Sequence, residues 1–246
     1  MNNVFIILVK PQLGQNIGSV ARVMKNLNFK NLRIVNPRDG WPNQDVISTA
    51  AGADDVITNT KVFDNVSEAC NDLNYLFASS ARKRDLNIKT LNLVNTVSSL
   101  NKTEFCRNDF KFGILFGCES SGLSNEDLIT ANQLIYIPSN SDFSSLNISH
   151  AVSLICWEFF KFFNDLILDQ NSKISLNTSP TIKDMDYFYK NLCEKLNNSG
   201  FFHSDFMKKS IMENIKVLFN RAELSSQEIK TLNGIIKSLY EYNKQA

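Results

Sequence analysis

The segment from Lys111 to His150 constrains the fold of this chain more than any other part of the sequence. An apolar run in this segment ends on Gly117, which predicts a buried strand whose last residue must leave the sheet. A second apolar run over residues 133–137 stops at Pro138, which cannot donate a hydrogen bond to a strand ladder, and a polar loop over 139–145 follows. Two buried strands that end in small, polar loops are typical of an open α/β sheet, which binds ligands at the carboxyl ends of its strands.

Predicted strands and helices alternate through the first 165 residues. The pattern predicts strands over 4–9, 32–35, 73–78, 111–117 and 133–137, and helices near 17–27, 44–51, 93–100 and 146–163. It also predicts short extended pieces over 56–63 and a helix of a few residues after Ser124, which is its N-cap. Such alternation predicts an α/β fold in which a mainly parallel sheet is covered by helices on both faces.

The composition of the sequence changes after residue 165. The stretch 166–183 is polar and rich in turn-forming residues, which indicates a linker. Beyond it lie three helical patterns, at about 184–197, 204–220 and 226–242. We therefore predict a main domain over 1–165, a linker over 166–183 and a small helical region over 184–246. A unit of this size buries only a thin core, so we expect it to lean on the main domain or on a second subunit.

Charge is informative here only through its distribution. The formal net charge is +1, so binding to nucleic acid cannot be argued from the total. Residues 1–40, however, hold one acid, Asp39, against Lys10, Arg22, Lys25, Lys30, Arg33 and Arg38. Three further bases, at 82–84, follow Ser79 and Ser80 at the end of a predicted strand. Both features suit a phosphate-rich partner, although solvated surface is an equally simple explanation for the first and an exposed turn for the second.

The cysteines and the apolar segments indicate the compartment. The five cysteines are scattered, with no Cys-x-x-Cys pair and no histidine at ligand spacing, which argues against a disulfide framework and against structural zinc. The apolar run at 4–9 is too short to span a bilayer and lacks the basic start of a signal peptide. We expect a cytoplasmic protein with no metal site and no membrane segment.

Three motifs follow one another along the chain and together carry a resemblance. They read Asn16-x-Gly18-x-x-x-Arg22, then Phe116-Gly117-x-Glu119-x-x-Gly122-Leu123, then Ile137-Pro138 followed at a distance by Ser144-Ser145-Leu146-Asn147. In this order the motifs resemble those of the SPOUT methyltransferases, more narrowly the SpoU branch of ribose 2′-O-methyltransferases. The resemblance covers nearly the whole chain, because residues 50–57, 79–82 and 218–224 also resemble the bacterial subfamily that methylates nucleotide 32 in the anticodon loop of tRNA.

The resemblance implies a fold and a cofactor. The C-terminal part of the sheet would be threaded into a trefoil knot, a feature otherwise almost absent from proteins. The cofactor would be S-adenosylmethionine, held largely by backbone groups of three loops, and small residues suit that task because they let the backbone approach a ligand closely. By resemblance, the cofactor-binding residues are Ser79, Ser80, Ala81, Gly117, Ile137, Ser144, Ser145 and Leu146.

The resemblance also implies roles in catalysis. Arg22 is the catalytic candidate, reaching the substrate ribose and its phosphate across a dimer interface. Because a guanidinium is essentially always protonated, we expect it to clamp a phosphate and stabilise the developing alkoxide, while the acceptor of the proton stays open. Ser145 and Asn147 would orient the ribose hydroxyl, and Glu119 would hold either Arg22 or a loop amide, unless it is simply a structural loop carboxylate. By resemblance, the residues that would contact RNA are Asn16, Arg82 and Arg84.

The implied activity is methylation of a tRNA ribose by a homodimer that depends on S-adenosylmethionine. Two alternatives stay open at this point. One is 2′-O-methylation of another RNA, either ribosomal RNA or a different tRNA position. The other is a non-catalytic RNA-binding protein that keeps the fold.

Overall fold

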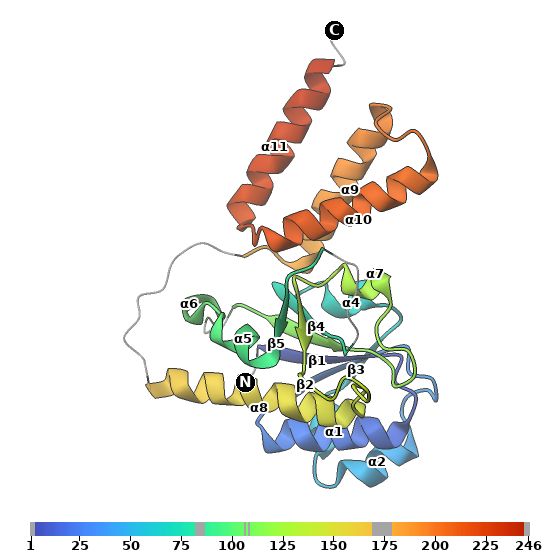
Figure 1. The fold of residues 1–246 in the computed structure, drawn as a ribbon, viewed down its shortest axis with the longest axis vertical. Helices are drawn as coiled ribbons and strands as arrows, with labels where there is room; N and C mark the ends of the chain where they lie inside the picture. Colours follow the sequence, from blue (N-terminus) through green and yellow to red (C-terminus); the bar gives the residue numbers. More distant parts are fainter. Residues whose placement is uncertain (1–2, 82–86, 106, 108, 169–178, 244–246) are drawn as a thin grey trace.

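Seven parallel strands form one sheet in the computed structural model, which describes residues 3–81, 87–105, 107, 109–168 and 179–243 (Figure 1). The strands are β1 Val4–Val9, β2 Asn31–Val35, β3 Lys61–Phe63, β4 Tyr75–Ser79, β5 Thr90–Asn92, β6 Phe112–Phe116 and β7 Gln133–Tyr136. Their order across the sheet is β3-β2-β1-β6-β4-β7-β5, and every pair in it is parallel. The predicted α/β class is therefore confirmed, and all the carboxyl ends of the strands lie along one edge. The trefoil knot stays a prediction.

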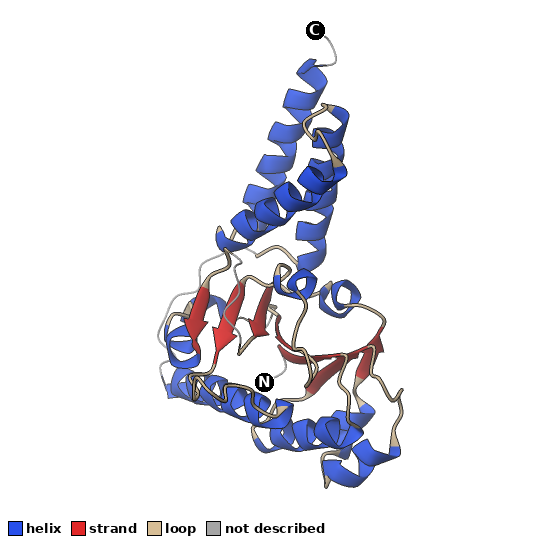
Figure 2. Ribbon diagram, turned by 45° about the vertical axis from the view of Figure 1, so that its right-hand side comes forward, coloured by secondary structure: helices blue, strands red, loops and turns tan. Residues whose placement is uncertain are grey.

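Helices cover both faces of this sheet, as predicted (Figure 2). In the described part of the chain they are α1 Gly14–Asn26, α2 Gln44–Ala50, α3 Asp54–Thr58, α4 Val66–Cys70, α5 Leu93–Ser98, α6 Lys102–Phe105, α7 Asn125–Leu128, α8 Ile148–Leu168, α9 Ile182–Asn198, α10 Asp205–Arg221 and α11 Ser226–Asn243. Alternate residues of β1 point to opposite faces: Leu8 joins the core that α1 and α8 cover, and Ile7 joins the core that α4 and α7 cover. None of the helices described here is long and apolar enough to cross a membrane.

The long apolar helix α8 forms because its buried side chains recur at helical spacing. Ile148, Val152, Ile155, Phe159 and Phe162 are all buried in the core beneath the sheet. This face packs α8 against β-sheet residues and beside α1 (Figure 1). The first turn of α8 is thereby held at the carboxyl edge of the sheet, next to the end of β7.

The prediction of extended pieces over 56–63 is wrong for its first half. Residues 54–58 form α3, and only Lys61–Phe63 is a strand. The helix begins after Gly52, whose φ of +85° turns the chain, and two carboxylates, Asp54 and Asp55, lie in its first turn, where the helix dipole favours them. The short elements α4, α6 and β5 were not predicted, because three to five residues carry too little periodicity to be recognised.

The helices α9 to α11 dock on the amino edge of the sheet and project from it (Figure 1). The side chain of Asn220 on α10 is buried, where its Nδ2 donates to the carbonyl of Ile129 at 3.1 Å and its Oδ1 accepts from the Tyr189 hydroxyl at 2.8 Å. Ile182 and Val217 extend the core of the main domain. The three predicted helices are confirmed, and the small helical region leans on the main domain.

Arg33, one of the bases near the N-terminus, is used by the fold itself. Its side chain is only 7% exposed, its guanidinium lies 3.9 Å above the ring of Phe5, and it makes two hydrogen bonds to Asp72, at 2.6 and 3.0 Å. Burial alone would raise the pKa of the Asp72 carboxyl, but the hydrogen bonds and charges of Arg33 and Lys111 outweigh burial and lower this pKa from 3.8 to about 2. Arg33 is therefore not available to a partner.

Asp72→Asn is expected to lower the free energy of unfolding at pH 7 by about 2 kcal/mol, below the 3–5 kcal/mol typical of fully buried pairs because the Asp72 side chain is 38% exposed. Since the pKa of Asp72 is lower in the folded state, its contribution is complete above about pH 4 and is lost as the pH falls toward 2. Urea unfolding of both proteins at several pH values measures this. The difference between them should be constant from pH 5 to 7 and shrink below pH 4; a difference independent of pH would contradict the assignment.

Candidate active site

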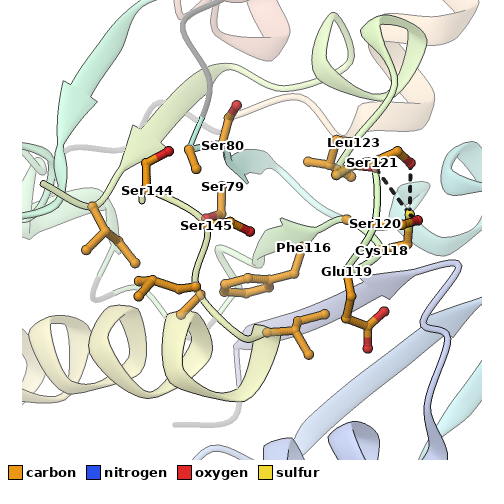
Figure 3. Close-up of a pocket in the computed structure, with 17 residues that line it drawn as sticks. Ser79, Ser80, Phe116, Cys118, Glu119, Ser120, Ser121, Leu123, Ser144 and Ser145 are labelled. Carbon is orange, nitrogen blue, oxygen red and sulfur yellow. Dashed lines mark hydrogen bonds between the residues drawn. The ribbon is translucent and has the colours of Figure 1, made fainter. Parts of the chain in front are cut away.

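A pocket opens at the carboxyl edge of the sheet, where the ends of β6, β4 and β7 lie side by side (Figure 3). Its volume is about 150 Å³. Three loops and the first turn of α8 line it: Ser79, Ser80 and Ala81 after β4; Phe116 to Leu123 after β6; Ile137, Ser144, Ser145 and Leu146 after β7; and Ile148 and Ala151. Because these three strands are neighbours in the sheet, segments far apart in the sequence converge on one cavity.

Two glycines shape the loop after β6. A Cβ atom on Gly117 would lie 2.2 Å from the backbone carbon of Gly122 and 2.2 Å from the backbone nitrogen of Leu123, so no other residue fits without displacing the backbone. Gly122 has a φ of +72°, and its N–H donates to the carbonyl of Cys118 at 2.9 Å, which closes the turn. The loop over 118–123 therefore folds tightly back on the end of its own strand and forms one wall of the pocket.

Glu119 ties this loop to the first motif and, through it, to the third. Its carboxylate accepts the backbone N–H of Gln12 at 3.0 Å and the side-chain amide of Asn16 at 2.6 Å. The side-chain oxygen of Asn16 in turn accepts from the Nδ2 of Asn147 at 3.0 Å, and the Asn147 oxygen accepts the N–H of Ser149 at 2.8 Å, at the start of α8. Because a carboxylate only accepts hydrogen bonds, the donor and the acceptor of each hydrogen bond in this series are determined. The three motif loops are thus joined in one network.

Figure 3 shows the Glu119 carboxylate directed toward the N-terminal segment and away from the serines of the pocket. Of the two roles considered for Glu119, the structure shows the contact with a loop amide and no contact with Arg22 among the described residues. Sequence reasoning missed Gln12, whose side chain also donates to the Ser120 hydroxyl at 2.9 Å. A single glutamine before a helix gives no signal of such a role.

Cys118, on the rim of the pocket, is placed among hydroxyl groups. Its sulfur lies 3.0 Å from the Ser121 hydroxyl oxygen and 3.6 Å from that of Ser120. Partial burial raises the pKa of this thiol, but hydrogen bonds from Ser121 and Ser120 outweigh burial and lower it below its ordinary value. The rim is therefore polar, whereas Phe116, Leu123 and Ile137 provide apolar walls.

The structure brings together most, but not all, of the residues singled out in the sequence. The eight cofactor-binding candidates Ser79, Ser80, Ala81, Gly117, Ile137, Ser144, Ser145 and Leu146 all line the pocket. Asn16 and Asn147 adjoin it through the network of Glu119. Arg22 lies on the exposed face of α1, outside the pocket lining of its own chain, and its side chain makes no hydrogen bond or ion pair within the described residues. Arg82 and Arg84 lie outside the described residues.

Comparisons with known proteins agree with this arrangement. The model of the SpoU rRNA Methylase family matches residues 3–157, and that of the C-terminal domain of the tRNA methyltransferase TrmJ matches residues 183–246. The tRNA (cytidine/uridine-2′-O-)-methyltransferase TrmJ of Sodalis glossinidius is 31% identical over 99% of this chain and 94% of its own length. That of Salmonella typhimurium is 32% identical over 99% of both chains. The crystal structure of TrmJ from Z. mobilis ZM4 superposes with a TM-score of 0.81 at 32% identity, covering 95% of this chain and 97% of that one.

The chain folds into a parallel sheet with a pocket at its carboxyl edge; the second and third motifs line that pocket, and the first motif is hydrogen-bonded to both. Together with the match to the SpoU model, these features define a SPOUT-class methyltransferase. It is an enzyme that uses S-adenosylmethionine to methylate the 2′-oxygen of RNA ribose. More particularly, the chain belongs to the TrmJ family of tRNA (cytidine/uridine-2′-O-)-methyltransferases.

The pocket residues fit this cofactor. The lining consists of short side chains and backbone, with apolar walls that suit an adenine ring and hydroxyls and backbone groups that suit ribose and amino-acid groups. Its one carboxylate, Glu119, is already satisfied by two donors. Among the described residues, no group of three or more His, Cys, Asp or Glu side chains is placed to hold a metal ion.

Proposed function

We propose that this protein methylates the ribose of nucleotide 32 in the anticodon loop of tRNA, in the cytoplasm. A single observation supports this activity: the second and third motifs line one pocket, and one hydrogen-bond network joins them to the first motif. The choice of nucleotide 32 rests on the resemblance of residues 50–57, 79–82 and 218–224 to the subfamily that methylates that position. The names of the relatives specify the 2′-oxygen of cytidine or uridine in tRNA, which supports this substrate class.

S-adenosylmethionine supplies an activated methyl group, so the protein has to position the ribose hydroxyl and ease the loss of its proton. Ser145 lines the pocket and Asn147 adjoins it at the start of α8, which supports assigning both the role of orienting that hydroxyl by hydrogen bonds. Asn147 is held in turn by Asn16 and Glu119. We assign Glu119 the role of positioning these amides, and the side chain of Asn16 an additional contact with RNA.

Arg22 is proposed to act across a dimer interface. It is exposed on α1 and lies outside the pocket of its own chain, so a second protomer is the simplest way to bring a guanidinium to each pocket. The neighbouring helix α8 exposes two large apolar side chains at i, i+3 spacing, Leu154 at 44% and Trp157 at 49%. A homodimer that covers these side chains would place α1 of each protomer at the interface.

The same proposal includes a domain organisation for the chain. Residues 1–165 carry the cofactor pocket and the knot, and 184–246 form the helical region. Residues 166–183 connect the two, although α8 extends into this segment to Leu168 and α9 begins within it at Ile182. Arg82 and Arg84, next to the pocket residue Ala81 in the sequence, are assigned to RNA phosphates.

The deciding experiment incubates the purified protein with S-adenosylmethionine and unmodified tRNA transcripts, then maps the methylated nucleotide by mass spectrometry. The proposal predicts one added methyl group on the ribose at position 32. Methylation at another tRNA position, or of ribosomal RNA in a parallel reaction with that substrate, would contradict the nucleotide assignment but keep the enzyme class. A transcript with a 2′-deoxy nucleotide at position 32 is the matched control, because it presents the same base without the attacking hydroxyl.

A further inference from the structure

The structure sorts the six bases of residues 1–40 by their partners. Three of them pair with carboxylates: Lys25 with Asp55, Arg33 with Asp72, and Arg38 with Asp39. The remaining three, Lys10, Arg22 and Lys30, are exposed and form no hydrogen bond or ion pair through their side chains within the described part of the chain. These three residues therefore carry the unpaired positive charge of this segment.

Lys10 lies on the edge of the sheet that bears the pocket. It directly follows β1, and its backbone N–H donates to the carbonyl of Val35 at 2.8 Å. Because Leu8 pairs in register with Phe116, continuing that register puts Lys10 level with Cys118 on the pocket rim. Two residues further on, Gln12 donates its backbone N–H to Glu119. Lys10 thus belongs to the loop that is fastened to the active-site network.

The backbone of Lys10 is held in an uncommon conformation. Its φ is 51°, in the left-handed region that costs free energy for a residue other than glycine. The loop keeps this conformation because both of its sides are bonded: the Lys10 N–H to Val35, and the carbonyl of Pro11 to the N–H of Arg38 at 3.1 Å. The hydrogen bonds of the fold therefore fix the backbone position of Lys10 near the rim of the pocket.

We propose that Lys10 binds a backbone phosphate of the RNA next to the nucleotide being methylated. This inference rests on the proposed RNA substrate. An ammonium group without a carboxylate partner, on the edge where the ribose must enter, suits a phosphate oxygen. The carboxylate of Glu119 accepts hydrogen bonds from Gln12 and Asn16, and Lys10 forms no ion pair with it.

Lys30 provides a matched control. It is also an exposed lysine without a partner among the described residues, but it precedes β2 and so lies at the amino edge of the sheet. The five residues of β2 separate the two edges, which amounts to about 17 Å at roughly 3.3 Å per residue. A general effect of net charge would be equal for the two lysines, whereas a specific phosphate contact would affect only Lys10.

The test compares wild type, Lys10→Gln, Lys10→Arg and Lys30→Gln as full-length proteins, measuring the Kd for tRNA transcript at several salt concentrations. Lys10→Gln is expected to weaken RNA binding about threefold to tenfold and to reduce the slope of log affinity against log salt by roughly 0.7–0.9, the share of one phosphate contact. Lys10→Arg should retain most of the affinity, and Lys30→Gln should match wild type. Thermal unfolding and the Kd for S-adenosylmethionine should be the same in all four.

An unchanged salt slope for Lys10→Gln, or an equal loss for Lys30→Gln, would overturn the proposal. Failure of the proposed function has a different signature. A wild type that binds tRNA but methylates no transcript would refute the function and leave the salt slopes to decide the role of Lys10. A wild type that methylates normally, with Lys10→Gln indistinguishable from it, would refute only the phosphate contact.

Discussion

Arg22→Ala is expected to lower kcat for methyl transfer by about 10²–10³-fold, the usual cost of removing one group that stabilises charge in a transition state. The 2′-oxygen gains negative charge as it attacks, and a fixed guanidinium offsets that charge without having to lose a proton. Because Arg22 is exposed and without a partner in the described residues of its own chain, its removal should leave folding intact. Single-turnover methylation of tRNA transcript measures the loss, and calorimetry should show unchanged affinity for S-adenosylmethionine.

Two variants on the same helix serve as controls. Arg22→Lys keeps the charge but not the planar fork of donors, so it should recover only part of the rate. Lys25→Ala removes an exposed base whose partner is Asp55 and should leave kcat unchanged. If Arg22→Ala retained a rate within about threefold of wild type, Arg22 would have no catalytic role.

Gly117→Ala is expected to lower affinity for S-adenosylmethionine by at least about tenfold and methyl transfer by about 10²-fold, the loss that a displacement near 1 Å can cause in an active site. The added Cβ would lie 2.2 Å from backbone atoms of Gly122 and Leu123, so the loop over 118–123 must move. That loop carries the pocket wall and Glu119, so cofactor binding and the network should fail together. Isothermal titration calorimetry measures the affinity directly.

Gly234→Ala is the matched control for this substitution. A Cβ on Gly234 meets nothing within 4 Å, and the residue lies within α11, where alanine is favoured over glycine by about 1 kcal/mol. This variant should be slightly more stable and should bind the cofactor as wild type does. Equal affinities for all three proteins would show that the turn at Gly117 does not shape the cofactor site.

The two inactive variants together test the dimer. If each active site uses the pocket of one protomer and Arg22 of the other, mixed dimers of Arg22→Ala and Gly117→Ala contain one intact site. Random exchange of subunits should then restore about a quarter of wild-type activity. A mixture as inactive as its components would show that Arg22 acts within its own chain.

The strands β1, β2, β4, β6 and β7 could be predicted because they are largely buried on both faces and read as apolar runs bounded by turn residues. The strand over 4–9 was predicted with the bounds that the structure shows, and Ser124 is the predicted N-cap of α7, where it forms a capping box with Asp127. Elements of three to five residues, such as α3 and β5, were mistaken or missed, since their form depends on what they pack against. The burial of charged side chains could not be predicted either, because nothing in the local sequence distinguishes the buried Arg33 from the exposed Lys10.

The sequence by itself determined which segments are buried, where each strand must end, and which small residues and motif side chains follow those ends, because burial and turn chemistry are local properties of the chain. Only the tertiary structure decided that β6, β4 and β7 are neighbours and so bring the three loops to one pocket. It also decided that Glu119 holds Asn16 and a loop amide, and that Arg22 lies outside its own pocket. The physical reason is that strand order and side-chain partners depend on contacts between residues about a hundred positions apart, which no local pattern encodes.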